Sequence, residues 1–229
     1  MDNKITVDNF KPLKLKKLYS GRNGTCYLTE DNEVFKHIET PNEESLKSLT
    51  KLNSNSFVFP KKLVYNKNGK LVGYIMDYVN GTTIKNMSGS TRMDCYKNGI
   101  SQIENDIAIL TNYKLHIIDA GVNNIMIDSE SNLKIVDTDF YETKSDLKNL
   151  YQANLTSVNY GLMYPIHDIS IQDFENDQLN KYLGWTLDGK MKVTDLLYEL
   201  GSEIYLRGMY PENTISEYKN QLKLIRKKL

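Results

Sequence analysis

Residues 116–141, HIIDAGVNNIMIDSESNLKIVDTDFY, combine a predicted β-hairpin with polar side chains at both of its ends. The apolar segments 125–127 and 133–136 are typical of two short strands, and the segment between them is rich in turn formers. A tight hairpin places the start of its first strand beside the end of its second strand. The residues that flank the two strands are therefore expected to lie on one rim.

Three polar side chains are expected on that rim. Asp119 and Asn124 precede the first predicted strand, and Asp137 follows the second. Carboxylate and amide oxygens of this kind suit Mg²⁺, which commonly takes one or two carboxylates together with the phosphate oxygens of a substrate. The sequence therefore predicts a magnesium site next to the hairpin.

The composition is that of a globular protein. Of the 229 residues, 40% are hydrophobic and 25% are charged, and 29 basic residues balance 29 acidic ones. Balanced charge gives no general attraction for nucleic acid or membrane surfaces, so neither is expected as a partner. The sequence begins without a signal-peptide-like apolar segment, and no run approaches a membrane span in length. A cytoplasmic location is expected.

The cysteines give little functional information. Cys26 and Cys95 are far apart in the sequence and match no metal-binding or redox motif. A disulfide between them is left open, but two scattered cysteines are more typical of a reduced, intracellular protein.

The first half of the chain is rich in predicted strands. Apolar segments separated by polar turns occur at residues 26–28, 34–36, 57–60, 62–65 and 71–78. Gly21 and Gly24 lie in a polar turn before the first of these segments. Glycine there would let backbone amides approach a phosphate, although an ordinary hairpin turn would use glycine too. Lys36 follows apolar residues, where it is either held for a phosphate or reaches solvent along its stem.

A helix is predicted over residues 41–53, where leucines recur every three residues on one face. Glu43 and Glu44 fall in its first turn. They either complement the positive end of the helix or pair with Lys36.

The composition changes near Asn80, where strand-like segments give way to helical patterns. We therefore predict an N-terminal lobe over residues 1–80 and a C-terminal lobe over residues 81–229. Apolar residues spaced three and four apart predict helices of the second lobe at residues 100–110, 144–155, 193–200 and 215–229.

The order of these features resembles the protein-kinase-like superfamily over about residues 18–141. Asp119 and Asn124 match the D-x-x-x-x-N spacing of that family's catalytic loop, and Asp137 matches its metal-binding aspartate. The further acid Asp139 is similar to the choline kinase and aminoglycoside phosphotransferase branch. The resemblance implies an α+β, bilobal protein-kinase-like fold, with a small antiparallel β-rich N-lobe and a mainly helical, reduced C-lobe.

The resemblance also implies a phosphotransferase that uses ATP and Mg²⁺ and acts on a hydroxyl-bearing acceptor, either a protein or a small molecule. Asp119 would orient or deprotonate the acceptor hydroxyl, and Lys36, steadied by one of the two helix glutamates, would hold the ATP phosphates. Asn124 and Asp137 would bind Mg²⁺. The remaining nucleotide contacts implied by the resemblance are Gly21, Gly24, Val34, Glu43, Glu44, Met76, Asp77 and Val79.

Several residues depart from the family's pattern. Ile117 and Ile118 stand where many protein kinases have His-Arg, so the arginine that commonly receives an activation-loop phosphate is lacking. Gly121 stands in place of a lysine, and Asp139 stands in place of the glycine of the D-F-G motif. Asp139 either adds a metal contact or caps a turn.

These matches and departures leave three hypotheses open. The chain is an active phosphotransferase, a pseudokinase that binds nucleotide or a partner without turnover, or an unrelated α+β protein in which the motif order arose by chance. The acceptor is left open too. An acidic segment of the second half suits either a cationic acceptor or a solvated loop, and its residues are Asp168, Asp173, Glu175 and Asp177.

Overall fold

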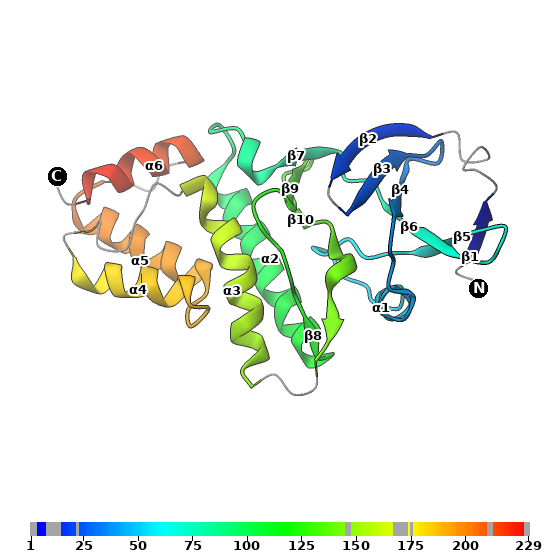
Figure 1. Ribbon diagram of the computed structural model, residues 1–229. Coiled ribbons are helices and arrows are strands. Elements are labelled where there is room, and N and C mark those ends of the chain that lie inside the picture. The colour runs from blue at the N-terminus through cyan, green and yellow to red at the C-terminus, as the bar shows by residue number, and fades with distance from the viewer. Residues whose placement is uncertain are drawn as a thin grey trace.

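A β-sheet lies at one end of the molecule and a group of helices at the other, as Figure 1 shows. This computed structural model describes residues 4–7, 15–21, 23–144, 148–166, 174, 176–209 and 213–226. Three acidic residues considered for a cationic acceptor, Asp168, Asp173 and Glu175, lie outside the described residues. The α+β class is confirmed and the layout is compatible with two lobes, while the boundary near Asn80 stays a prediction.

Within the described residues, the strands form one large sheet and two small ones. In chain order they are β1 Lys4–Val7, β2 Lys16–Gly21, β3 Gly24–Leu28, β4 Glu33–Ile38, β5 Lys62–Asn66, β6 Leu71–Asp77, β7 Gly81–Thr83, β8 Leu115–His116, β9 Ile125–Asp128, β10 Leu133–Ile135 and β11 Glu142–Thr143. The large sheet has the order β1-β5-β6-β4-β3-β2, in which β1 is parallel to β5 and the other pairs are antiparallel. One small sheet has the order β10-β9-β7, and the other pairs β11 with β8.

Most of the predicted strands are confirmed, because clear polar turns separate them. The segments 26–28, 34–36, 62–65 and 71–78 correspond to β3, β4, β5 and β6. The turn after β5 is fixed by Asn66, whose side chain accepts the N–H groups of Asn68 and Lys70 at 3.0 and 2.9 Å. The strand predicted over residues 57–60 is wrong, since the described chain forms there only an isolated pairing of Phe57 with Ile135. The sequence did not indicate β1, which is only four residues long.

Side chains alternate between two apolar faces of the large sheet. Val34 packs in the main core, whereas Phe35 packs in a smaller cluster on the opposite face. Lys36 lies two residues from Val34 and therefore shares its face. In the sheet register, Lys36 on β4 lies between Cys26 on β3 and Tyr74 on β6. The side chain of Lys36 therefore lies on the face of the sheet that packs in the main core.

The predicted hairpin is confirmed by β9 and β10. The two strands pair antiparallel, with Ile135 opposite Ile125. The side chain of Asp128 closes the turn by accepting the N–H of Asn132 at 2.8 Å. β7 pairs with the other edge of β9, so the hairpin becomes part of a three-stranded sheet.

The helices lie mainly in the second half of the chain. They are α1 Glu43–Leu49, α2 Met93–Asn112, α3 Leu150–Met163, α4 Asp177–Leu187, α5 Val193–Leu206 and α6 Ile215–Leu224, with 3₁₀ turns η2 Ile84–Asn86, η3 Thr138–Phe140 and η4 Tyr164–Ile166. No helix in the described part of the chain combines the length and the apolar character that crossing a membrane requires.

The predicted helices are found, with different boundaries. The helix predicted over residues 41–53 is the shorter α1, and the apolar stripe at 100–110 belongs to α2, which begins earlier. The helix predicted over residues 144–155 overlaps α3, although residues 145–147 lie outside the described chain. The predictions at 193–200 and 215–229 correspond to α5 and α6, and the sequence did not indicate α4.

The segment between α1 and β5 fastens the large sheet to the rest of the molecule. Ser56 and Val58 bond to β10 through the backbone of Ile135, at 2.6 and 2.8 Å. Asp106 on α2 accepts hydrogen bonds from the side chain of Ser54 at 2.6 Å and from the backbone of Ser56 at 2.9 Å. These bonds set the sheet against the β9–β10 hairpin, which is where the predicted site lies.

Candidate functional site

A buried lysine and two carboxylates, here called the lysine–carboxylate cluster, form the centre of the candidate site. Lys36 on β4 is 5% exposed, and its Nζ donates to Oδ1 of Asp139 at 2.7 Å and to Oδ1 of Asp137. The two aspartates belong to η3 and to the residue before it, just after β10. Segments 101 and 103 residues apart in the sequence therefore meet at one ammonium group.

Tyr74 on β6 holds Asp139 from the sheet side. Its hydroxyl donates to Oδ1 of Asp139 at 3.1 Å, and its backbone lies opposite Lys36 in the β4–β6 register. Gly73 permits this close strand pairing, because a Cβ there would lie 2.0 Å from the carbonyl oxygen of Lys36. The hydroxyl of Tyr74 and the ammonium of Lys36 thus share one carboxylate oxygen.

The charges of the cluster shift one another's pKa. Burial lowers the pKa of Lys36, but the charges of Asp139 and Asp137 raise it by more, so it ends above its ordinary value. Burial and a hydrogen bond with Asp139 raise the pKa of Asp137 to about 6, against the lowering effect of Lys36. Burial also raises the pKa of Asp139, but the hydrogen bond with Asp137 and the charge of Lys36 bring it below its ordinary value. Of the two carboxyls, Asp139 is held in its charged form, and Asp137 is the one whose pKa is raised toward neutral pH.

Asn124 joins the loop that carries Asp119 to the loop that carries Asp137. Its side-chain nitrogen donates to the carbonyl oxygen of Asp119 at 2.7 Å. Its backbone carbonyl oxygen accepts the N–H of Val136 at 2.8 Å, one residue before Asp137. The hairpin therefore brings the loops that carry the three predicted rim residues together.

Asp119 and Asp137 share an unusual backbone conformation. Their φ angles are 57° and 64°, in the left-handed region. Aspartate adopts this region more readily than most residues with a Cβ, but it remains uncommon and is often found where a side chain must be aimed at a site. Both aspartates are thus held in place by the fold around them.

The oxygen atoms of this rim suit a magnesium ion in their chemistry. The side chain of Asp137 is 33% exposed, and Asn124 keeps its amide oxygen because the bond to Asp119 uses its nitrogen. Among the described residues, no three His, Cys, Asp or Glu side chains gather closely enough to hold a metal by themselves. The residues therefore fit a Mg²⁺ ion that also takes phosphate oxygens from a nucleotide, which is the usual arrangement for this ion.

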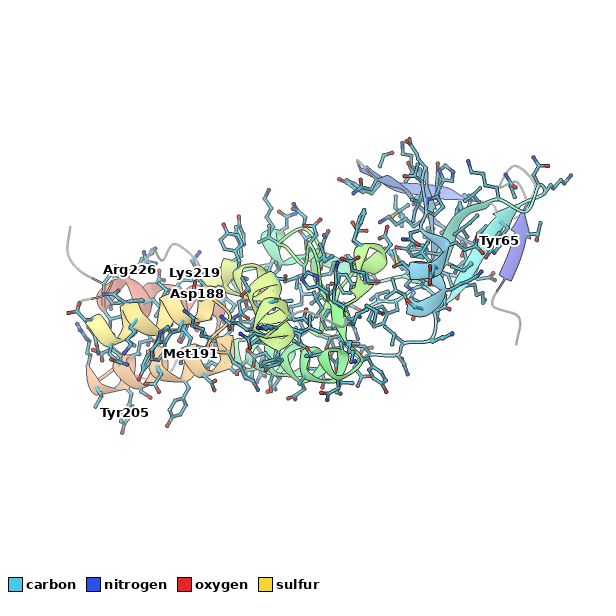
Figure 2. All side chains as sticks on the ribbon, turned by 60° about the horizontal axis from the view of Figure 1, so that its bottom comes forward. Tyr65, Asp188, Met191, Tyr205, Lys219 and Arg226 are labelled. Atoms are coloured by element: carbon cyan, nitrogen blue, oxygen red, sulfur yellow. The ribbon has the colours of Figure 1, made fainter. Side chains whose placement is uncertain are left out.

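The expected pairing of Lys36 with Glu43 or Glu44 is wrong for this structure. Glu43 instead accepts a hydrogen bond from the hydroxyl of Tyr65 at 3.0 Å and pairs with Lys47 at 2.7 Å. Figure 2 labels Tyr65 on the large sheet, at the end of the molecule opposite helices α4 to α6. Glu44 is exposed in the first turn of α1, where it complements the positive helix end. The physical reason is that the loop after β10 already supplies two carboxylates to the lysine.

Gly21 and Gly24 lie opposite each other where β2 and β3 meet. Residue 22, between them, lies outside the described residues. Gly24 has a packing reason of its own, because a Cβ there would lie 2.1 Å from the carbonyl oxygen of His37 on β4. A role of either glycine in phosphate binding stays a prediction.

Four further nucleotide contacts implied by the resemblance divide into two groups. Val34 and Met76 lie opposite each other on β4 and β6, and both are buried. Asp77 and Val79 line a cavity of about 590 Å³, which is bordered by the segment between α1 and β5 and by the turn of the β9–β10 hairpin. The lysine–carboxylate cluster does not line this cavity. That cavity therefore does not bring these four residues and the cluster together.

Sequence reasoning missed two buried tyrosines of the site. Tyr74 bonds to Asp139, and Tyr141 is 1% exposed with a hydroxyl that has no hydrogen-bond partner among the described residues. Burial raises the pKa of Tyr141 well above its ordinary value, and the charges of Asp137, Asp119 and Asp139 raise it further. Sixteen tyrosines are spread over the chain, so no pattern distinguishes these two.

Comparisons with known proteins do not assign a family. No family model matches the chain, and no curated protein matches it significantly. A function is therefore inferred from the geometry and chemistry of the site itself.

Proposed function

We propose that the protein is an ATP- and Mg²⁺-dependent phosphotransferase, of the protein-kinase-like kind, that transfers the γ-phosphate to a hydroxyl on a protein or a small molecule. One observation carries the proposal. A sheet lysine, Lys36, meets Asp137, while Asn124 links the loop of Asp137 to Asp119. These residue types fill separate roles in phosphoryl transfer, and they come from distant parts of the chain.

Phosphoryl transfer depends chiefly on positioning and on stabilising negative charge. Lys36 stays protonated in the cluster, so it is suited to bind the phosphates of ATP. Asn124 and Asp137 would hold Mg²⁺, whose charge would neutralise the phosphate oxygens. Asp119 is exposed at the edge of the rim, where it can orient an acceptor hydroxyl or take its proton.

Lys36 bonds to Asp137 as well as to Asp139. The phosphates offer Lys36 a stronger partner than one oxygen of Asp137, because they carry several negative charges. Transfer of Lys36 from Asp137 to the phosphates would leave the carboxylate of Asp137 available to the metal. Asp139 keeps its contact with the lysine in this scheme.

The direct test is an ATP-consumption screen with Mg²⁺ across protein acceptors, choline-like alcohols, aminoglycosides and nucleosides. Asp119→Ala should reduce turnover by about 100-fold or more, because removal of a general base commonly costs that much. Glu142→Gln is the matched control, since it changes an exposed, lysine-paired carboxylate of the same segment. Equal turnover in both variants would contradict the proposal.

A second candidate is a nucleotide- or partner-binding module without turnover. The observation that favours it is the direct pairing of Lys36 with Asp137, which neutralises the expected metal ligand. Ile117, Ile118 and Asp139 also depart from the family's motifs. Mg²⁺-dependent ATP binding without phosphorylation of any acceptor, including the protein itself, would favour this module over the enzyme.

A further inference from the structure

We infer that Asp139, held by the hydroxyl of Tyr74, is the residue that positions Lys36 for nucleotide binding. This inference rests on the proposed function and assigns to Asp139 the part that the family resemblance gives to Glu43 or Glu44. Its bonds to Lys36 and Tyr74 add a third role to the metal contact and the turn cap that the sequence left open. Asp139 is a positioning residue, which acts through Lys36.

The first support is the difference in exposure between the two carboxylates of the cluster. The side chain of Asp139 is 4% exposed, and that of Asp137 is 33% exposed. Lys36 bonds to both. An ion approaching from solvent therefore reaches Asp137 first, whereas Asp139 lies behind it against the sheet. The two carboxylates would therefore have different roles, in which Asp137 binds the metal and Asp139 binds Lys36.

The second support is the bonding of Asp139 to the sheet. Oδ1 of Asp139 accepts from Lys36 at 2.7 Å and from Tyr74 at 3.1 Å. Tyr74 is fully buried and lies opposite Lys36 on the neighbouring strand. The hydroxyl of Tyr74 therefore holds the carboxylate of Asp139 next to Lys36. A charge-assisted hydrogen bond of this kind is among the stronger interactions that a side chain can make.

The third support is that the residues on both sides of Asp139 are bonded to the N-terminal half. Thr138 donates from its hydroxyl to the carbonyl oxygen of Val58 at 2.9 Å. The carbonyl oxygen of Tyr141 accepts a hydrogen bond from the side chain of Ser45 on α1 at 2.9 Å. These two bonds bracket η3, so Asp139 has little freedom to leave Lys36. Helix α1 thus contributes to the site through Ser45, which holds η3.

The inference predicts a specific pattern in three variants. Asp139→Asn should weaken Mg·ATP binding by about tenfold or more, because it removes the charge that holds Lys36. Tyr74→Phe should weaken it less, since the carboxylate remains. At saturating ATP, we compare the Mg²⁺ concentration that gives half of the maximal ATP binding. This concentration should stay at the wild-type value in Asp139→Asn and should rise in Asp137→Asn. Glu142→Gln, with its exposed pair to Lys144, should change neither quantity.

A second measurement reports on Lys36 without nucleotide. Brief acylation of the amines, followed by mass spectrometry of the peptides, measures how readily each lysine reacts. Lys36 should react faster in Asp139→Asn than in the wild type or in Glu142→Gln, while melting temperatures confirm that each variant is folded. Asp139→Glu should restore part of both the slow acylation and the Mg·ATP binding.

The possible outcomes separate this inference from the proposed function. If the wild type binds Mg·ATP and Asp139→Asn binds it equally well, the positioning role is overturned while the proposed function survives. The positioning role is also overturned if only Glu43→Gln weakens Mg·ATP binding, or if Asp139→Asn changes the Mg²⁺ concentration needed for that binding. If the wild type binds no Mg·ATP, both fail. Faster acylation in Asp139→Asn would then identify Asp139 as a structural partner of Lys36 only.

Discussion

Asp139 beside the sheet and Glu104 among the helices are both buried carboxylates, but the groups that bond to them differ. Glu104 on α2 is 1% exposed and accepts the backbone N–H and the hydroxyl of Thr194 at 3.1 and 2.5 Å. Asp139 accepts from a lysine and a tyrosine hydroxyl. Burial raises the pKa of Glu104, against the bonds from Thr194, whereas the pKa of Asp139 is lowered.

Burial alone therefore does not distinguish the two carboxylates; their bonding partners do. Glu104 bonds to the first turn of α5, where a carboxylate satisfies N–H groups that the helix leaves free, and it fastens α5 to α2. Asp139 instead pairs with the side chain of Lys36, which in the proposed function also meets the phosphates of ATP.

Replacement of Lys36 should have the largest effect on both stability and function. Lys36→Met leaves Asp137 and Asp139 close together without their cation, so we expect a loss of about 3 kcal/mol in the free energy of unfolding. Mg·ATP binding and turnover should fall at least about 100-fold. Denaturant unfolding and an ATP-consumption assay measure the two effects. A Lys36→Met protein as active as the wild type would show that the cluster is only structural.

Glu104→Gln should affect stability alone. The amide keeps one oxygen toward Thr194 but loses the charge, so we expect a loss of about 1 to 2 kcal/mol in the free energy of unfolding. The activity of each folded molecule should equal that of the wild type, because Glu104 does not contact the site. Turnover at a temperature well below unfolding checks this. A large loss of turnover in the folded variant would remove the distinction between the two carboxylates.

The pH dependence of stability offers a finer test of Asp137. Its pKa is about 6 in the folded protein, above the ordinary 3.8, so the folded state binds this proton more tightly than the unfolded state does. Ionisation of Asp137 therefore costs stability as pH rises from about 4 to about 6. Asp137→Asn lacks this cost, so its stability relative to the wild type should increase over that range and then level off. A relative stability that falls over the same range, measured by denaturant unfolding, would contradict the assignment.

Cys26 reports on the same cluster with the smallest expected effect. Burial raises its pKa to about 11, with Lys36 lowering it and the two aspartates raising it. At pH 8, roughly one Cys26 thiol in a thousand would be ionised, so alkylation should be slow. In a Cys95→Ser background, Asp139→Asn should make alkylation faster because one negative charge is removed. An unchanged rate would place Asp139 farther from Cys26 than the structure does.

The strands and the hairpin could be predicted because their signals are local. Asn66 and Asp128 close turns with their own side chains. The short apolar segments beside these turns are typical of strands. Hairpin geometry then brought the loops that carry Asp119, Asn124 and Asp137 together.

The partner of Lys36 could not be predicted, because it depends on contacts between distant segments. A glutamate in the first turn of α1 looks the same in sequence whether it faces Lys36 or Lys47. The outcome is set by bonds such as Ser45 to Tyr141 and Thr138 to Val58, which hold η3 against the sheet. No local pattern encodes those bonds. The role of Tyr74 was hidden for the same reason.

The most direct test of the central claim is a calorimetric titration of the protein with ATP, with and without Mg²⁺. We expect saturable binding at one site that requires Mg²⁺ and disappears in Lys36→Met. ATP binding that is indifferent to Mg²⁺ and to Lys36, or no binding by the folded wild type, would contradict it.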